Sequence, residues 1–377
     1  MTAGPVYLDH AATTALGPEA REAMEPYLSE RFGNASEPHA YGREARAALE
    51  GARRAVAELL DCEPAQVVFT SGGSEADNQA VFGFCGRPLG RLVVSSIEHP
   101  AVREPALELD RQGFEVAWVR VDGGGTVDVE AFAAAVRPGD RVAAAMWANN
   151  VTGVVQPVEE LAGIARERGV PFHCDAVQAA ASLEVSFARS GVDSMAVSAH
   201  KLHGPKGVGC LVARDPGRLR PLVLGGGQER GHRSGTENIA GCVGFGAALA
   251  GVRTSADHRR RMRTRLEAAL PVGVDVVSAG SDRLPGHSLL RTPGLRAELL
   301  VLALDREGFA VAAGSACSAG DAEPSHVLVA QGMSAEDARS VIRVSIGART
   351  TADEIDGFIA ALDRTIGTLR RGILPAA

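Results

Sequence analysis

The chain contains only two lysines, Lys201 and Lys206, and both lie in the stretch AVSAHKLHGPKGVG (196–209). Lysine and arginine together number 39, so the remaining members of this group are all arginines. A lysine in a partly enclosed place can lose its proton and act as a base or nucleophile, whereas an arginine keeps its proton. Lys201 follows an apolar strand-like stretch, and we therefore predict that its amine takes part in chemistry. We interpret Lys206 as a turn residue.

Two further features could bind the ends of a charged ligand. Asp175 closes the apolar stretch VPFHCDA, where a carboxylate is costly to bury without a partner. It is either a helix N-cap or the counter-ion of a cationic group. The turn SGGS (71–74) precedes a helix-like stretch and offers backbone N–H groups to an anion, although an ordinary N-cap would look the same. A phosphate-binding turn, an anchored aspartate and one reactive lysine are together what pyridoxal 5'-phosphate requires.

Cys317 and Arg343 complete the set of candidate residues. Cys317 lies among small residues in AAGSACSAGDAEPSHVL, where it is either an unimportant turn residue or an accessible nucleophile on a flexible loop. Arg343 lies in VIRVSIG, where strand alternation places it on the face opposite Ile342 and Val344. It is either a surface charge or a bidentate clamp for a substrate carboxylate. Both alternatives stay open for each residue.

Other kinds of site fit the sequence less well. SGGS matches neither G-x-G-x-x-G nor G-x-x-x-x-G-K-[ST], so we do not expect a nucleotide-binding P-loop. His173, Cys174 and Asp175 are adjacent in a strand-like stretch and would point to alternating faces, so we expect no metal there. The six cysteines form no C-x-x-C pair, which favours reduced thiols over a zinc site or disulfides.

The composition is ordinary for a soluble globular protein, with 45% hydrophobic and 23% charged residues. A net charge of −7 gives no basic footprint for nucleic acid, and no apolar run reaches the length of a membrane span. We interpret the arginine-rich run HRRRMRTRLE (258–267) as the solvated face of a helix. The first residues do not resemble a signal peptide, and we expect a cytoplasmic protein.

The elements that must position these residues alternate between strand and helix. Strand patterns occur at QVVFT, RLVVSSIEH, EVAWVRVD, DRVAAAMWANN, VPFHCDAVQ, VDSMAVSAH and GVGCLVAR, with helical stretches between most of them. This alternation predicts an α/β fold with a mostly parallel sheet covered by helices. After about residue 255 the pattern changes to a smaller α+β region, with weaker strands at VDVVSAG and HSLLRT. We expect a large domain over 15–255 and a small domain formed by 1–14 and 256–377.

Polar residues cluster where the predicted strands end. They lie in TSGGSE (70–75), EH (98–99), NN (149–150), DAVQ (175–178) and SAHK (198–201). Ligands of parallel sheets bind at the carboxyl ends of the strands. We therefore expect these five loops to converge on one site.

The motifs together resemble the cysteine desulfurases of the NifS/IscS type, which are pyridoxal-phosphate enzymes of fold type I in the class-V aminotransferase group. The resemblance runs nearly end to end. It rests on YLDHAATT, FGNAS, TSGGSEADN, EHPAV, NNVTGVVQPV, DAVQA, SAHKLHGPKGVG, GGGQERGHRSGTEN, GSACSAG, PSHVL and IRVSIG. No single stretch would be specific, but the set is.

The resemblance implies a role for each matching position. Lys201 is the Schiff-base lysine, His99 stacks on the pyridine ring and is a candidate proton shuttle, and Cys317 is the nucleophile that forms a persulfide. Asp175 pairs with the ring nitrogen and Gln178 with the 3'-oxygen. The cofactor's phosphate is bound by Gly73, Ser74, Ser198 and His200. The resemblance also implies a homodimer in which Thr236 reaches the phosphate of the neighbouring subunit. The substrate's carboxylate side is bound by Asn34, Asn150 and Arg343.

The implied reaction converts L-cysteine to L-alanine and transfers the sulfur to Cys317 and then to an acceptor protein. Some positions depart from the family: Val151 replaces a glutamate, Ser74 replaces a threonine, and Ala312 and Ala313 replace serines. The spacing from Cys317 to PSHVL resembles the group that delivers sulfur directly to partner proteins. Iron–sulfur cluster assembly, thiolation of tRNA, sulfur modification of DNA and a biosynthetic pathway are all open as destinations.

Two other classes of function compete with this one. A pyridoxal-phosphate C–S or C–Se lyase or a transaminase would share the cofactor site but would not need Cys317. An assembly scaffold that holds sulfur or a cluster would need no cofactor, although one loop cysteine is too few for a cluster, which takes three or four ligands. We expect no direct contact with nucleic acid or membrane.

Overall fold

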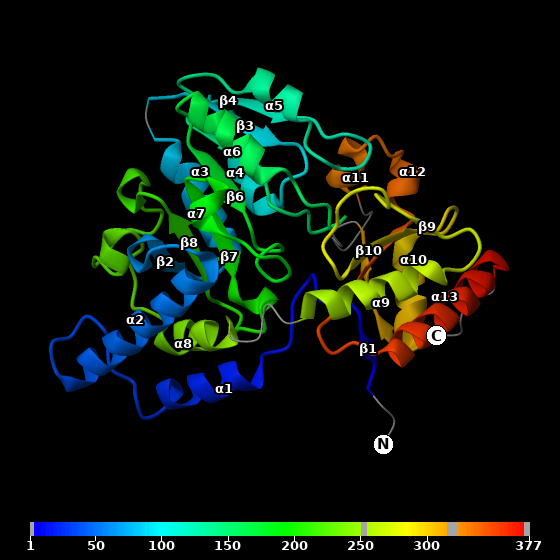
Figure 1. Ribbon diagram of the computed structural model, residues 1–377, viewed down its shortest axis with the longest axis horizontal. Coiled ribbons are helices and arrows are strands. Elements are labelled where there is room, and N and C mark those ends of the chain that lie inside the picture. Colours follow the sequence, from blue (N-terminus) through cyan, green and yellow to red (C-terminus); the bar gives the residue numbers. More distant parts are fainter. Residues whose placement is uncertain (1–3, 87, 250–254, 315–322, 373–377) are drawn as a thin grey trace.

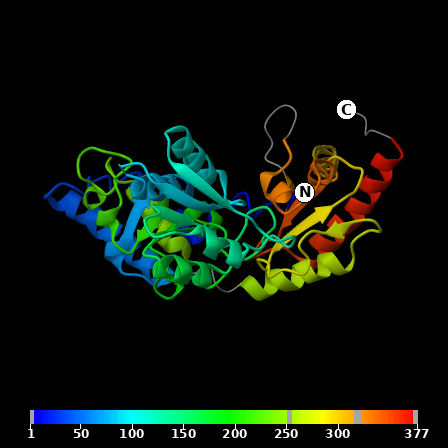
Figure 2. The ribbon, with the colours of Figure 1, turned by 90° about the horizontal axis from the view of Figure 1, so that it is seen from above.

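The computed structural model describes residues 4–86, 88–249, 255–314 and 323–372. Two groups of elements lie side by side, each built around its own sheet, and the N-terminal segment passes between them (Figures 1 and 2). The larger sheet has seven strands in the order β2-β8-β7-β6-β5-β3-β4. Their bounds are β2 Val67–Thr70, β3 Arg91–Ser95, β4 Glu115–Val119, β5 Val142–Ala144, β6 Phe172–Asp175, β7 Ser194–Ser198 and β8 Gly209–Ala213.

The larger sheet is mostly parallel, as the sequence predicts. Only β8 runs antiparallel to its two neighbours, β2 and β7. All residues of β2, β5, β6, β7 and β8 are buried, because helices cover both faces of the sheet. The elements of this group are α1 Pro18–Met24, α2 Ala40–Leu60, α3 Gly73–Phe84, α4 Pro100–Arg111, α5 Val129–Ala135, α6 Val158–Glu167, α7 Phe187–Ser190 and α8 Ile239–Ala248, with the short 3-10 helices η1 Glu25–Leu28, η2 Pro64–Gln66, η3 Ala199–Lys201, η4 Pro216–Arg218 and η5 Glu229–Gly231.

The smaller sheet is antiparallel, with the strand order β12-β13-β10-β9. Leu290, Ile342 and Val344 pack with the apolar faces of α10 and α13 into a second core. Leu8 joins this core because β1 (Val6–Tyr7) pairs with β11 (Phe309–Ala310), so the N-terminal segment belongs to the smaller group of elements. The other bounds are β9 Asp275–Val276, β10 His287–Arg291, β12 Ala312–Ala313, β13 Val341–Ser345, α9 Ala256–Ala268, α10 Ala297–Arg306, α11 His326–Ala330, α12 Ala335–Ala338 and α13 Ala352–Arg370.

Three details differ from the sequence predictions. The strand expected over DRVAAAMWANN is only Val142–Ala144, although Trp147 still donates its backbone N–H to the carbonyl of Asp175. The strand expected over VDVVSAG shortens to Asp275–Val276. The domain boundaries at residues 15 and 255 stay a prediction.

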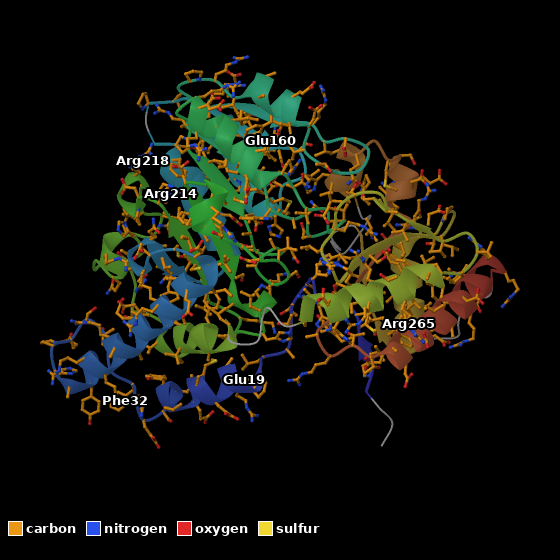
Figure 3. All side chains as sticks on the ribbon, viewed as in Figure 1. Glu19, Phe32, Glu160, Arg214, Arg218 and Arg265 are labelled. Carbon is orange, nitrogen blue, oxygen red and sulfur yellow. The ribbon has the colours of Figure 1, made fainter. Side chains whose placement is uncertain are left out.

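The third difference concerns the arginine-rich helix α9. Arg260 and Arg265 are exposed, as a solvated face requires, and Arg265, labelled in Figure 3, forms an ion pair with Asp356. The interpretation is wrong for Arg259, which is half-buried and whose guanidinium donates hydrogen bonds to Ser182 and Ala181. A run of arginines cannot show from its sequence which of them the fold turns inward. Within the described residues, no helix is long and apolar enough to cross a membrane.

Candidate active site

One cavity lies where the strands of the larger sheet end, with a volume of about 350 Å³. We call it the active-site cavity. Segments that follow β2, β3, β5, β6 and β7 line it, together with the N-terminal segment and one residue of β13. Its lining is Ala11, Ala12, Gly73, Ser74, Asp77, His99, Asn150, Asp175, Val177, Gln178, Ser198, His200, Lys201 and Arg343. The fold thus brings together candidate residues that are up to 270 positions apart in sequence, from Gly73 to Arg343.

Lys201 lies at the end of the short helix η3, directly after β7. Its Nζ donates hydrogen bonds to the carbonyl oxygens of Ala11 at 2.5 Å and of Ala12 at 2.6 Å. Burial, and then the positive charge of Arg343, lower the pKa of Lys201 to about 8. The amine is therefore held in a defined place and loses its proton far more easily than an ordinary lysine.

Asp175 ends β6 and is buried, with its Oδ1 accepting the backbone N–H of Val177 at 2.9 Å. Burial raises its pKa, and Asp77 beside it is also buried with a raised pKa. The Asp77 carboxylate has His173 as its partner, with 3.1 Å between His173 Nε2 and Asp77 Oδ1. Two buried carboxylates with raised pKa values make this end of the cavity a place for a cationic group.

His99 caps the N-terminus of α4, and its Nδ1 accepts the backbone N–H of Ala101 at 3.1 Å. Burial lowers the pKa of His99, so the ring is neutral near pH 7. Because Nδ1 accepts this bond, the proton of the neutral ring lies on Nε2. His99 therefore offers a flat neutral ring with one N–H donor to the cavity.

Another part of the cavity, at the start of α3, suits an anion. Gly73 is the first residue of α3, and a Cβ atom there would lie 2.6 Å from Val177 Cγ2, so the backbone approaches the cavity as closely as only glycine allows. Ser74, Ser198 and His200 surround this helix start. Lys206 lines the adjoining opening beside the same residues, which the interpretation as a turn residue missed.

Arg343 reaches the active-site cavity from β13. Its Nη2 donates to Asp9 Oδ1 at 2.6 Å and its Nη1 to the backbone carbonyl of Asn150 at 2.9 Å. Its Nε is buried and has no hydrogen-bond partner within the described part of the chain. Arg343 is thus no surface charge, and Asp9, which the sequence did not suggest, is its partner here.

Two predicted residues do not line the active-site cavity. Asn34 lies in the turn before α2, where its Oδ1 accepts the backbone N–H of Ser36 at 2.9 Å. Thr236 lies in the loop over 225–238, which contacts α3 through the ion pair of Arg233 with Glu75, and it is not among the residues that line the cavity. Gln178, in contrast, lines the cavity and donates to the carbonyl of Ala11 at 2.9 Å.

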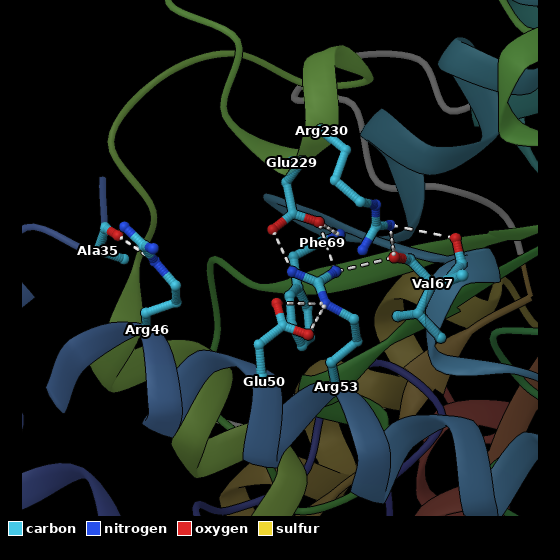
Figure 4. A network of polar contacts seen from close by, with 9 residues as sticks. Ala35, Arg46, Glu50, Arg53, Val67, Phe69, Glu229 and Arg230 are labelled. Carbon is cyan, nitrogen blue, oxygen red and sulfur yellow. Dashed lines mark hydrogen bonds and ion pairs between the residues drawn. The ribbon is translucent and has the colours of Figure 1, made fainter. Parts of the chain in front are cut away.

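The loop over 225–238 is fixed by a buried network of charges (Figure 4). The guanidinium of Arg53 donates two hydrogen bonds of 2.7 Å to Glu229, and its Nε–H is shared between the two carboxylate oxygens of Glu50 at 3.0 and 3.2 Å. Glu229 also accepts the backbone N–H of Phe69, at the end of β2, at 2.8 Å. Arg53 and Glu229 are 2% and 5% exposed, so this ion pair is fully compensated inside the protein.

Cys317 lies outside the described residues. The described chain on either side of it adjoins the active-site cavity: Ala312 is the register partner of Arg343, and His326 Nε2 lies 2.9 Å from the carbonyl oxygen of Glu98, next to His99. The other five cysteines are described, and burial raises the pKa of each, as for Cys62, whose pKa is about 12.

The family model that matches this chain is "Aminotransferase class-V", over residues 6–358. The chain belongs to the class-V aminotransferases. It is 44% identical over 374 residues to a cysteine desulfurase of Cereibacter sphaeroides, covering 97% of this chain and 96% of that one. It is 40% identical over 375 residues to the cysteine desulfurase IscS of Dictyoglomus turgidum, covering 97% and 95%.

Solved structures agree with the sequence relatives. A NifS-like protein superposes with a TM-score of 0.90 at 32% identity, covering 96% of this chain and 99% of that one. The structure of SspA in complex with cysteine superposes with a TM-score of 0.83 at 31% identity, covering 92% and 100%. The predicted fold class is thereby confirmed, and the chain is an enzyme of the cysteine desulfurase branch of the class-V aminotransferases.

The cofactor of this family is pyridoxal 5'-phosphate, and the active-site cavity fits it. The carboxylates of Asp77 and Asp175 suit a protonated ring nitrogen, and the helix start at Gly73 suits a phosphate. Lys201, with its lowered pKa, lines the same cavity. Asp77 and Lys206 also line these openings, which the sequence did not suggest because only the fold brings them there.

The structure shows the surroundings of Val151, one of the positions that depart from the family. Val151, which replaces a glutamate, packs against the core of the larger sheet and against the cluster around Leu289 and Leu328. Its backbone N–H donates to Asn149 Oδ1 at 2.8 Å. The position is apolar in this chain and belongs to the packing between the two groups of elements.

Proposed function

We propose that this desulfurase converts L-cysteine to L-alanine and stores the sulfur as a persulfide on Cys317. The observation that supports it most directly is the meeting of Lys201, Asp175 and Arg343 in one cavity, at the place where both described flanks of Cys317 also arrive. A lyase or transaminase would use the same three residues, so Cys317 is the residue that separates the alternatives.

Each end of the cofactor would meet residues of matching chemistry. Pyridoxal 5'-phosphate, when bound, accepts the electrons released at the substrate's Cα and Cβ. Asp175 would keep the ring nitrogen protonated, His99 would lie against the ring, and Gln178 would donate to the 3'-oxygen. The phosphate would take hydrogen bonds from a set of donors at the start of α3 and the end of β7, namely Gly73, Ser74, Ser198 and His200.

The substrate's carboxylate would be bound by Arg343, with Asn150 beside it. Arg343 already has its Nη1 and Nη2 engaged by Asn150 and Asp9, while its buried Nε is unpartnered within the described residues. A substrate carboxylate would pair with this Nε–H and replace Asp9 at Nη2. Exchange of one carboxylate for another leaves the buried charge compensated throughout.

Proton transfer would be the task of Lys201 and His99. The free amine of Lys201 would remove the proton from the substrate's Cα, as its lowered pKa permits. The Nε2–H of neutral His99 would supply or return a proton on the other side of the cavity. The two groups are held in place by the Ala11 and Ala101 backbones.

The sulfur step uses the thiolate of Cys317 as the nucleophile. Its sulfur would attack the substrate's sulfur, so that an S–S bond forms while the Cβ–S bond breaks. The electron pair of the broken bond stays with the carbon skeleton, which takes up protons and leaves as alanine. The persulfide then passes its outer sulfur to an acceptor protein, for iron–sulfur cluster assembly or another thio-modification.

A homodimer would complete the site. Thr236 does not line the cavity of its own chain, so we place its contact with the phosphate in the neighbouring subunit. Asn34 lies away from the cavity in the same way. We further propose a cytoplasmic enzyme whose partners are L-cysteine and an acceptor protein, with no direct contact with nucleic acid or membrane.

The test is a turnover experiment on the holoenzyme with L-cysteine and a reductant, measuring sulfide and alanine together. The proposal predicts equal amounts of both, lost in Cys317→Ser and kept in the matched control Cys62→Ser. Sulfide that persists in Cys317→Ser, or pyruvate in place of alanine, would show a lyase.

A further inference from the structure

A second, smaller cavity lies behind Lys201, with a volume of about 50 Å³. It shares a wall with the active-site cavity, formed by Ala11, Gln178 and Lys201. We call it the rear cavity. Its own polar lining includes His10, His203, Arg259 and His287. No aspartate or glutamate lies among its described lining residues.

Arg259 is the fixed positive charge of the rear cavity. Its Nη1 donates to Ser182 Oγ and its Nη2 to the carbonyl of Ala181, each at 3.0 Å, and both acceptors are uncharged. Its Nε is buried and has no partner within the described residues, where no carboxylate lies at ion-pair distance from it either. Burial lowers the pKa of Arg259 only to about 10, so the group is still charged at neutral pH.

His287 presents a second buried group without a partner. It is 6% exposed, and its Nε2 makes no hydrogen bond to the described chain. Burial, Arg343 and Arg259 hold the pKa of His287 well below its usual range, and burial and His203 lower that of His10 to about 4. Both imidazoles are therefore neutral at pH 7, and the charge of Arg259 is left uncompensated.

The backbone is shaped to hold these side chains. A Cβ atom at Gly347 would lie 2.3 Å from the ring of His10, and one at Gly286 would lie 2.7 Å from the carbonyl oxygen of Ile346 and 3.3 Å from Arg259 Cδ. Glycines at both places therefore leave room for a histidine and an arginine that line the rear cavity. The arrangement is tightly packed, and an isolated buried cation is costly unless a counter-charge accompanies it.

We propose that the rear cavity binds one small, singly charged inorganic anion between Arg259 and His287. The volume limits the size of the ligand: a water molecule takes roughly 10–15 Å³ of such space, so the cavity has room for a halide, which is only slightly larger, together with a few water molecules. The cavity is thus too small for a second amino acid or a phosphate ester. The Nε–H of Arg259 and an N–H of the neutral His287 ring supply the donors.

Lys201 forms part of the wall of the rear cavity, so an anion bound there changes the pKa of its amine. A negative charge there offsets Arg259 and attracts the proton of Lys201, so a bound anion raises the pKa of Lys201. The inference rests on the charges of the rear cavity alone and is independent of the substrate proposed above.

The anion is tested on the holoenzyme with sodium chloride against sodium gluconate at equal ionic strength, since gluconate does not fit. We expect chloride to raise the melting temperature by about 2 °C. The increase should vanish in Arg259→Met and persist in Arg260→Met, which changes an exposed arginine of the same helix. Equal melting temperatures in both salts, or a chloride effect that survives in Arg259→Met, would overturn the proposal.

A second measurement does not depend on the variant folding. Crystals of the unaltered holoenzyme grown in sodium bromide should show an anomalous scattering peak within hydrogen-bond distance of Arg259 Nε. Density there without an anomalous signal would identify water as the occupant and would overturn the proposal.

Discussion

The two cavities that meet at Lys201 have opposite electrostatic character. The active-site cavity contains Asp77 and Asp175, two buried carboxylates with raised pKa values, whereas the rear cavity contains Arg259 and no described carboxylate. Asp175 accepts a backbone N–H and Arg259 donates to uncharged acceptors, so within the described residues neither charge has an ion-pair partner. The lesson is that an uncompensated buried charge marks the place of a ligand, and its sign tells which part of a ligand belongs there.

Arg53 shows that a buried charge does not always mark a ligand site. It is as deeply buried as any arginine of the described chain, but Glu229 and Glu50 compensate its charge fully. Its role is to hold the loop over 225–238 against β2. Buried charge alone thus says little about function, and the presence or absence of a partner decides between structure and binding.

The largest expected effect comes from removing the amine between the two cavities. Lys201→Ala should lower the rate of alanine formation about 10³-fold or more, because both the attachment point and the base are lost. Lys201→Arg should be equally inactive, since arginine keeps its charge but cannot give up a proton. Activity retained in Lys201→Arg, measured as alanine from L-cysteine, would show that charge and not deprotonation matters.

The second effect compares an arginine that has ion-pair partners, Arg53, with one that has none among the described residues, Arg259, in a buffer without small anions. Arg53→Met should lower the free energy of unfolding by about 3 kcal/mol, because Glu229 would be left buried and unpaired. Arg259→Met should leave the free energy of unfolding unchanged or raise it, because it removes a charge that has no partner. Urea denaturation of both variants measures the difference, and equal losses would break the distinction drawn between them.

The third effect concerns Arg343, the residue of β13 that lines the active-site cavity, and the KM for L-cysteine. Arg343→Gln should raise KM for L-cysteine about 10- to 100-fold, because it removes charged hydrogen bonds to the substrate's carboxylate. Arg291→Gln, which changes a half-buried arginine of the neighbouring strand β10, should leave KM unchanged. Steady-state kinetics of the two variants decides whether Arg343 binds the substrate or only Asp9.

The smallest effect is a pH dependence. In the cofactor-free protein the pKa of Lys201 is lowered to about 8, so its reactive free amine is scarce below that pH and dominant above it. The rate of pyridoxal 5'-phosphate binding should therefore rise about tenfold between pH 7 and pH 9 and then level off. Absorbance of the bound cofactor follows the rate, and a midpoint near the ordinary lysine pKa would contradict the effect of burial.

Much of the active site could be predicted from the sequence because its residues directly follow strands of a parallel sheet. Lys201, Asp175 and His99 belong to that group, and their motifs are local. Asp9 and Asp77 could not be predicted as partners, since their positions depend on how the N-terminal segment and α3 pack. Arg259 was misread for the same reason: its neighbours Ser182 and Gly286 are distant in sequence.

The most direct test of the account is to locate the transferred sulfur. The holoenzyme would be given one equivalent of L-cysteine labelled with heavy sulfur, its free thiols blocked, and its peptides weighed. We predict one labelled sulfur on the peptide that contains Cys317 and none on the peptides of the other five cysteines. Alanine formed without label on Cys317, or label on another cysteine, would contradict the account.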